Sequence, residues 1–247
     1  MTMQDTTRLF GLGLGPGNPD YMTVRARKLL ETADRLVHFC KRGRRGNART
    51  IADAVVGPNP EREIALVYPV TTEIPADHPD YAAALNPFYE EAAARLLAEV
   101  EAGRTVGVLC EGDPFFYGSF MHLWWRLKDR MPIEVVPAVT AMSGAWTHAG
   151  APITWGDDVL TVVPGTLPET ELNRRLSGTD AAVVMKLGSH LPKVRAVLKS
   201  TGLFERAIYV ERATMAEERI IPLPDLPEDW NAPYFSLIIV PGQGRRV

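Results

Sequence analysis

Cysteine and long apolar segments are both scarce in this sequence. Its 247 residues include two cysteines, Cys40 and Cys110, which stand alone in their segments and form neither a disulfide framework nor a zinc motif. The five histidines never reach metal-ligand spacing, and no HExxH pattern occurs. The apolar runs have the length of a strand, so no transmembrane helix is expected. These absences indicate a cytoplasmic protein that holds no metal.

Charge of one sign is not in excess either, because the net charge is −3. That value argues against a general nucleic-acid-binding surface, and the polar residues 1–8 lack the apolar core of a signal peptide. A local exception lies in residues 41–49, which contain five bases and no acid: Lys41, Arg42, Arg44, Arg45 and Arg49. The run is either a solvated loop or a surface for carboxylates. RNA is less favoured, because no aromatic residues are interleaved.

Strand-length apolar runs alternate with segments of helical periodicity along the whole chain. Strands are expected at 9–14, 36–39, 64–68, 105–110, 133–136, 160–163, 181–185, 207–210 and 235–240. Helices are expected after Thr23, at 50–55, from Asn86-Pro87 to Gly103, at 120–127, and at about 168–176 and 191–200. Residues 58–87 hold six prolines and predict a long irregular crossing. The alternation predicts an α/β fold with helices covering a mostly parallel sheet.

Two further expectations concern the second half of the chain. A strand at 219–223 is expected to pair with the last strand. The small-residue segment 138–150 is expected to be a hinge, which gives two α/β domains at 1–138 and 139–247.

The first segment that could carry chemistry is residues 11–17, with the sequence GLGLGPG. A glycine-dense turn after a strand lets the backbone approach a ligand and presents N–H groups to it. A dinucleotide fingerprint with Asp34 as the ribose acid does not fit, because GxGxxG started at Gly11 ends on Pro16 and started at Gly13 ends on Asn18. No GK[ST] follows, which excludes a P-loop. The alternative is an ordinary strained connection.

The second segment is residues 111–118, with the sequence EGDPFFYG, at the end of the expected buried strand 105–110. Ligands of open α/β sheets bind at that end of the strands. Asp113-Pro114 favours a turn, and Gly112 permits close approach of the backbone. Taken alone, this segment could also be an ordinary strand-to-helix connection.

Together the two loops resemble those of the tetrapyrrole methylases, in which a GxGPG loop is followed by a Gly-Asp-Pro loop. Three later segments add to the resemblance: PAVTAMS at 137–143, VMKL at 184–187 and ERAT at 211–214. Two departures occur, since Ala138 and Glu111 stand where glycine is usual. The segment HFCKRGR at 38–44 and the long 58–87 insertion look most like the branch of the family that methylates precorrin-2 at C20.

The resemblance implies a class III methyltransferase-like fold, with an S-adenosylmethionine cleft between two domains, and a homodimer. The cofactor-contacting residues that it implies are Pro16, Glu111, Gly112, Asp113, Phe116, Thr140, Ala141, Met185 and Ala213. Apolar Met185 and Phe116 suit an adenine pocket, although such residues are also common in protein cores. If a side chain assists as a base, Glu111 and Tyr117 are the candidates.

The substrate implied by the resemblance is a small tetrapyrrole fringed with carboxylates, with no nucleic acid or membrane partner. Lys41, Arg42, Arg44 and Arg45 are then the predicted substrate-binding residues. Trp125 and Trp146 could also stack on the macrocycle, whereas Trp124 lies on an apolar helical stripe. The alternatives are a methyltransferase for another corrinoid, ribosomal RNA or a diphthine precursor, and, outside the family, a nucleotide-dependent oxidoreductase or a non-catalytic tetrapyrrole binder.

Overall fold

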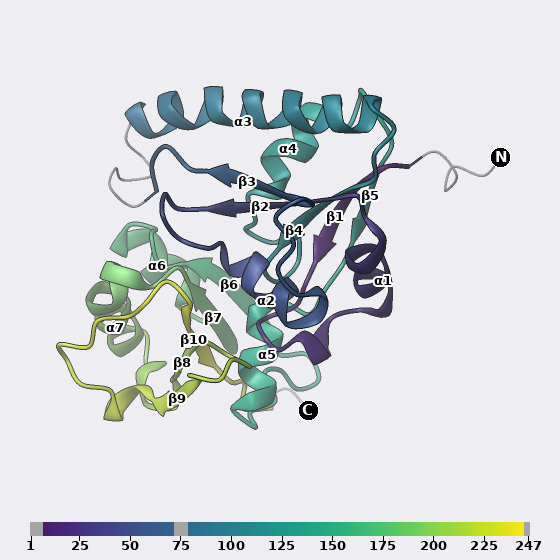
Figure 1. The fold of residues 1–247 in the computed structure, drawn as a ribbon. Helices are drawn as coiled ribbons and strands as arrows, with labels where there is room; N and C mark the ends of the chain where they lie inside the picture. Colours follow the sequence, from purple (N-terminus) through teal and green to yellow (C-terminus); the bar gives the residue numbers. More distant parts are fainter. Residues whose placement is uncertain (1–6, 72–78, 245–247) are drawn as a thin grey trace. The chain divides into compact units, whose positions relative to one another are not determined.

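The computed structural model describes residues 7–71 and 79–244, and the chain divides into two compact units, Met1–Thr140 and Ala141–Val247 (Figure 1). Each unit contains a five-stranded sheet and its own helices. The expected α/β class is confirmed. Within the described ranges, no helix is both long and apolar enough to cross a membrane.

The sheet of the first unit is entirely parallel, with strand order β3-β2-β4-β1-β5. Its strands are β1 (Leu9–Gly13), β2 (Arg35–Cys40), β3 (Glu63–Val67), β4 (Val106–Cys110) and β5 (Ile133–Val136). Its helices are α1 (Val24–Thr32), α2 (Asn47–Val56), α3 (Pro79–Glu101) and α4 (Phe120–Leu127), with a short 3₁₀ helix at Pro19–Tyr21.

Both faces of this sheet are covered by helices, which lie on opposite sides of it in Figure 1. Val37, Val106 and Val108 belong to a cluster with α3 and α4, whereas Leu36 and Leu109 pack with α1 and α2. Neighbouring residues of a strand point to opposite faces, so a strand buried on both sides must be apolar throughout. All five residues of β4 are buried, as the unbroken apolar run at 105–110 predicted.

Helix α1 begins where the sequence predicted, and α3 does not. The Thr23 hydroxyl accepts a hydrogen bond from the Ala26 N–H at 3.2 Å, which caps α1. Helix α3 was expected to begin at Asn86-Pro87, yet it starts at Pro79 and runs through Pro87. Proline removes a backbone donor inside a helix. Leu85, just before it, is buried against the sheet, and this packing keeps the helix continuous. The proline-rich segment 58–87 is therefore helical at its end, and residues 72–78 lie outside the described ranges.

The sheet of the second unit has the order β6-β7-β10-β8-β9. Its strands are β6 (Leu160–Pro164), β7 (Ala181–Met185), β8 (Ile208–Glu211), β9 (Arg219–Pro222) and β10 (Ser236–Val240). Its helices are α5 (Ala141–His148), α6 (Glu169–Leu176) and α7 (Leu191–Ser200), with 3₁₀ helices at Gly188–His190, Phe204–Arg206 and Leu223–Asp225. Helices α6 and α7 pack with one apolar cluster and α5 with another.

Two expectations for this unit were wrong. Its sheet is not mostly parallel, because β6 and β7 pair in parallel and the other three pairings are antiparallel. Strand β9 pairs with β8 and not with the last strand, because β10 lies between β7 and β8 and both of its edges are already bonded. The expected hinge at 138–150 includes the boundary between the two units, at Thr140 and Ala141, followed by α5. Its role as a hinge stays a prediction.

Candidate functional site

The two glycine-containing loops of the first unit lie side by side at the carboxyl edge of its sheet. Strands β1 and β4 are neighbours, with Gly13 opposite Cys110. Beyond them, the Leu14 N–H donates to the Cys110 carbonyl at 3.0 Å, and the Gly112 N–H donates to the Gly15 carbonyl at 2.8 Å. Two loops that are a hundred residues apart in sequence therefore form one local structure.

Two glycines are required for this arrangement. Gly15 has φ +84°, and a Cβ atom there would lie 3.2 Å from the Tyr21 carbonyl oxygen. Gly112 is buried and has φ +64°. Side chains other than hydrogen are disfavoured in this left-handed region. Pro16, which follows Gly15, is also buried. The result is a close approach of two backbone segments.

Asp113 organises the second loop through its carboxylate. Its Oδ1 accepts a hydrogen bond from the Phe115 N–H at 2.9 Å, and its Oδ2 accepts one from the Ala138 N–H at 3.0 Å. The carboxylate thereby joins the 111–118 loop to the 137–140 segment. Because both carboxylate oxygens are used in this way, we expect Asp113 to contact a cofactor through its backbone and to hold the loop in shape through its side chain.

Glu111 lies beside the start of α2 and is exposed. Desolvation of its carboxyl group raises its pKa, while hydrogen bonds involving the Asn47 side chain and the Ala48 backbone lower it. A glutamate carboxyl group at this place can exchange a proton or orient a positively charged group.

Tyr117 is held in an unusual backbone conformation. Its φ is +55°, which is uncommon for a residue with a side chain, and 41% of its surface is exposed. Its ring contacts that of Phe116, with centroids 4.9 Å apart. Such strain persists where surrounding structure imposes it, and it is frequent at functional sites.

The predicted cofactor residues of the second unit gather on one apolar cluster. Ala213 belongs to its buried core, and the half-buried Ala141 and Met185 pack against it. Met185 ends β7, and its carbonyl accepts a hydrogen bond from the Gly165 N–H at 2.6 Å. Thr140, also half-buried, is the last residue of the first unit.

Residues around Ala213 that were not among the predicted cofactor contacts hold its turn in place. Glu211 is buried, and its carboxylate accepts hydrogen bonds from the Tyr209 hydroxyl and from the Arg212 guanidinium, both at 2.9 Å. Arg212 and Thr214, on either side of Ala213, have φ of +48° and +69°. A glutamate ending an apolar strand was a visible signal, but positive φ at non-glycine residues cannot be read from a sequence.

The predicted substrate residues separate into two groups. Lys41, Arg42 and Arg44 are exposed and line a pocket of about 340 Å³ together with residues 68–71. Arg45 instead forms ion pairs with Asp53 and Glu63. The structure therefore brings three of the four predicted bases to one pocket.

The other residues considered from the sequence lie in varied surroundings. Asp34, the ribose acid of the rejected dinucleotide reading, accepts a hydrogen bond from the Thr105 N–H at 2.7 Å and so joins two strands. Trp125 is 68% exposed, whereas Trp124 and Trp146 pack against apolar clusters. Among the described residues, no three His, Cys, Asp or Glu side chains are grouped as they would be around a metal ion.

Comparisons with known proteins identify the family of this chain. The family model for tetrapyrrole (corrin/porphyrin) methylases matches residues 8–227. A precorrin-2 C(20)-methyltransferase from Sinorhizobium sp is 51% identical over 235 residues, which is 95% of each chain. The cobalamin biosynthesis protein CobIJ of Mycobacterium bovis is 46% identical over 96% of this chain, which spans 46% of that protein's length.

A solved structure supports the fold. The X-ray structure of cobalt precorrin-4 methyltransferase, a cobalamin biosynthetic enzyme, matches with a TM-score of 0.71 at 25% identity and covers 94% of each chain. The family model matches most of the sequence, including the motifs at 11–17 and 111–118, and one relative is 51% identical. The chain belongs to the tetrapyrrole (corrin/porphyrin) methylases.

Proposed function

We propose that this methyltransferase transfers a methyl group from S-adenosylmethionine to C20 of precorrin-2, which gives precorrin-3A in cobalamin biosynthesis. The observation that carries the proposal is the 51% identity over 95% of both chains to a relative named for that reaction. The joined loops at Gly15 and Gly112 supply a backbone surface of the kind that a small cofactor needs.

The chemistry of the gathered residues fits S-adenosylmethionine. Its sulfonium is a cation, which neutral carbonyl oxygens suit, and its adenine requires an apolar surface. The loops of the first unit offer backbone groups at Pro16, Gly112 and Asp113 beside the ring of Phe116. The second unit offers the apolar surface around Met185. The full set that would hold the cofactor is Pro16, Glu111, Gly112, Asp113, Phe116, Thr140, Ala141, Met185 and Ala213.

S-adenosylmethionine, when bound, supplies a methyl group that is activated for attack by a carbon nucleophile. The meso carbon between the first and last rings of the reduced macrocycle has enamine character and is already such a nucleophile. Positioning two reactants can contribute about 7–11 kcal/mol, whereas a general base adds about 10²–10⁴-fold. We therefore assign the main catalytic effect to orientation, with Glu111 and Tyr117 as candidates to accept a proton.

We further propose that the substrate's acetate and propionate groups bind the basic segment 41–45. Guanidinium groups pair with carboxylates through two parallel hydrogen bonds, which gives strength and orientation. The proposal is supported by the pocket that Lys41, Arg42 and Arg44 line together with residues 68–71. A homodimer in the cytoplasm, acting on a small molecule without nucleic acid, membrane or metal, stays a prediction.

The proposal is tested by binding and turnover. Isothermal calorimetry should detect S-adenosylmethionine and S-adenosylhomocysteine but not NAD(P). Incubation with S-adenosylmethionine and enzymatically prepared precorrin-2 should give a product with one added methyl group by mass spectrometry. A protein that binds the cofactor but leaves precorrin-2 unchanged would show that another tetrapyrrole is the substrate. Failure to bind the cofactor would exclude the methyl transfer itself.

A further inference from the structure

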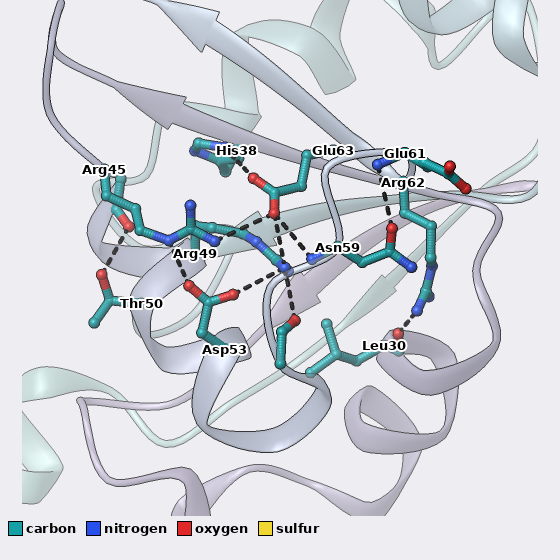
Figure 2. A network of polar contacts seen from close by, with 12 residues as sticks. Leu30, His38, Arg45, Arg49, Thr50, Asp53, Asn59, Glu61, Arg62 and Glu63 are labelled. Carbon is teal, nitrogen blue, oxygen red and sulfur yellow. Dashed lines mark hydrogen bonds and ion pairs between the residues drawn. The ribbon is translucent and has the colours of Figure 1, made fainter.

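The five bases of residues 41–49 differ in what they contact. Arg45 precedes α2 and Arg49 lies in it. Both form ion pairs with Asp53 of α2 and Glu63 of β3 (Figure 2). Lys41, Arg42 and Arg44 line the pocket instead. A run of like charge in the sequence is therefore divided by the fold into a paired group and a pocket-facing group.

Arg49 is the buried centre of the paired group. Its side chain has no exposed surface, and its Nη2 lies 2.8 Å from Asp53 Oδ1 and 3.1 Å from Glu63 Oε1. The same nitrogen donates to the Gly57 carbonyl at 3.0 Å. A buried charge must be paired to be tolerated. Two arginines and two carboxylates make this network electrically neutral, and it joins α2 to β3.

Arg45 connects this network to the basic segment. Its Nε–H donates to Asp53, and its Nη2 lies 3.2 Å from Glu63 Oε1. The side chain is 43% exposed, whereas those of Asp53 and Glu63 are 21% and 15% exposed. Arg45 thus reaches from the surface onto carboxylates that Arg49 already fixes, through two of its three guanidinium nitrogens.

The chain next to Arg45 is fixed as well. Gly46 precedes α2, and a Cβ atom there would lie 2.2 Å from the Phe39 carbonyl oxygen and 2.7 Å from His38 Nδ1. The C-terminal end of the basic segment therefore packs closely against β2. Its entry follows β2 directly, and the Arg44 N–H donates to the Lys41 carbonyl at 3.1 Å, which closes a turn.

The three pocket-lining bases keep their charges available. Among the described residues, 7–71 and 79–244, Lys41, Arg42 and Arg44 form no ion pair that would neutralise them. Three positive groups on a short turn repel one another, so a mobile turn would spread them. A turn held at both ends keeps them at one pocket, which lowers the entropy cost of binding a ligand with several carboxylates.

We infer that Arg45 is a positioning residue for substrate binding: its ion pairs with Asp53 and Glu63 fix the turn that presents Lys41, Arg42 and Arg44 to the substrate's carboxylates. This inference rests on the proposed function, because it assumes a polycarboxylate tetrapyrrole in that pocket. It revises the direct substrate contact expected of Arg45. A direct contact would require Arg45 to leave one of its two carboxylates, or to bind the substrate through Nη1 alone.

The two roles predict opposite results when Asp53 is neutralised. If Arg45 contacts the substrate directly, Asp53→Asn releases it and the tetrapyrrole KM falls or stays unchanged. If Arg45 positions the turn, Asp53→Asn and Arg45→Met each raise KM. The double variant raises KM by less than the product of the two single effects, because both substitutions remove the Arg45–Asp53 ion pair. Arg45→Lys should restore KM in part, since a lysine can keep one ion pair but not the fork.

The experiment measures the tetrapyrrole KM, kcat, S-adenosylmethionine affinity and melting temperature for these variants. Arg27→Met is the matched control, because Arg27 pairs with Glu31 on the exposed surface of α1. We expect Arg45→Met and Asp53→Asn to raise KM by about fivefold to tenfold, with kcat and cofactor affinity within about twofold of the parent. Arg42→Ala/Arg44→Ala should raise KM by about tenfold or more without lowering the melting temperature.

Each failure has its own meaning. If Arg45→Met lowers only the melting temperature, Arg45 is structural and the inference is wrong. If Asp53→Asn lowers KM, Arg45 contacts the substrate directly and the inference is again wrong. If Arg42→Ala/Arg44→Ala leaves KM unchanged, the pocket does not bind the substrate, and the substrate site under the proposed function fails first.

Discussion

The Gly112 N–H donates a hydrogen bond to the Gly15 carbonyl oxygen, with 2.8 Å between nitrogen and oxygen. This bond joins the loop after β1 to the loop after β4, at the edge of the sheet where ligands of α/β proteins bind. Both residues have positive φ, so the joined loops depend on glycine at each position. The cofactor site that we propose is built on this contact.

Replacing Gly112 should therefore weaken cofactor binding. Gly112→Val places a branched side chain at φ +64° and costs about 1–3 kcal/mol of backbone strain. We expect S-adenosylmethionine affinity by calorimetry to fall by about tenfold or more, while far-UV circular dichroism stays native. Gly103→Val is the matched control, because Gly103 has φ +81° and nothing within 4 Å of its Cβ position. Equal losses of affinity in both variants would remove Gly112 from the site.

Asp113 should act through the two N–H groups that it accepts. Asp113→Asn replaces one acceptor oxygen with a donor, which leaves one N–H unsatisfied at a cost of about 1–3 kcal/mol. We expect a lower free energy of unfolding in urea and weaker cofactor binding, since the loop is braced by this carboxylate. Asp129→Asn is the control, because that side chain is 83% exposed. A variant with parent stability and affinity would show that the bracing is unimportant.

Met185 should form part of the adenine pocket. Met185→Asp brings an unpaired carboxylate to an apolar surface, which we expect to reduce S-adenosylmethionine affinity by about tenfold or more. Ile208→Asp is the control, because Ile208 is half-buried on the same apolar cluster and has no predicted cofactor contact. If the two variants lose stability equally and keep the parent's affinity, Met185 is a core residue only.

The strands and the α1 cap could be predicted because their causes are local. An unbroken apolar run such as 106–110 can be satisfied only by a strand buried on both faces, and Thr23 with the apolar spacing after it specifies a helix start. The start of helix α3 could not be predicted, because Pro87 disfavours a helix on its N-terminal side and only packing of Leu85 on the sheet reveals those turns.

The site was predicted in part, for a similar reason. The loops were recognised because glycines and Asp-Pro are specific, whereas their joining at Gly15 and Gly112 depends on β1 and β4 being neighbours. The ion pairs of Arg45 could not be predicted, because its partners Asp53 and Glu63 lie 8 and 18 residues away and on two other elements. Pairing between distant residues cannot be read from charge patterning.

Stability should fall with acidification, in part through His38. Burial lowers the pKa of His38, with Arg49 and Arg45 adding to the effect and Glu63 opposing it. Below about pH 6.5, His38 is protonated in the unfolded chain but not to the same extent in the folded chain. The free energy of unfolding therefore decreases as pH falls through that value. Melting temperatures at about pH 7.5 and 5.5 should therefore differ more in the parent than in His38→Gln. Equal differences would mean that His38 titrates normally.

The central claim is methyl transfer to C20 of precorrin-2, and the position of the transferred carbon tests it most directly. S-adenosylmethionine with an isotope-labelled methyl group is incubated with the protein and precorrin-2, and the product is examined by carbon NMR. The account predicts one labelled methyl group per macrocycle, attached to the meso carbon between the first and last rings. A label on any other carbon, or a labelled product that forms equally well without the protein, would contradict it.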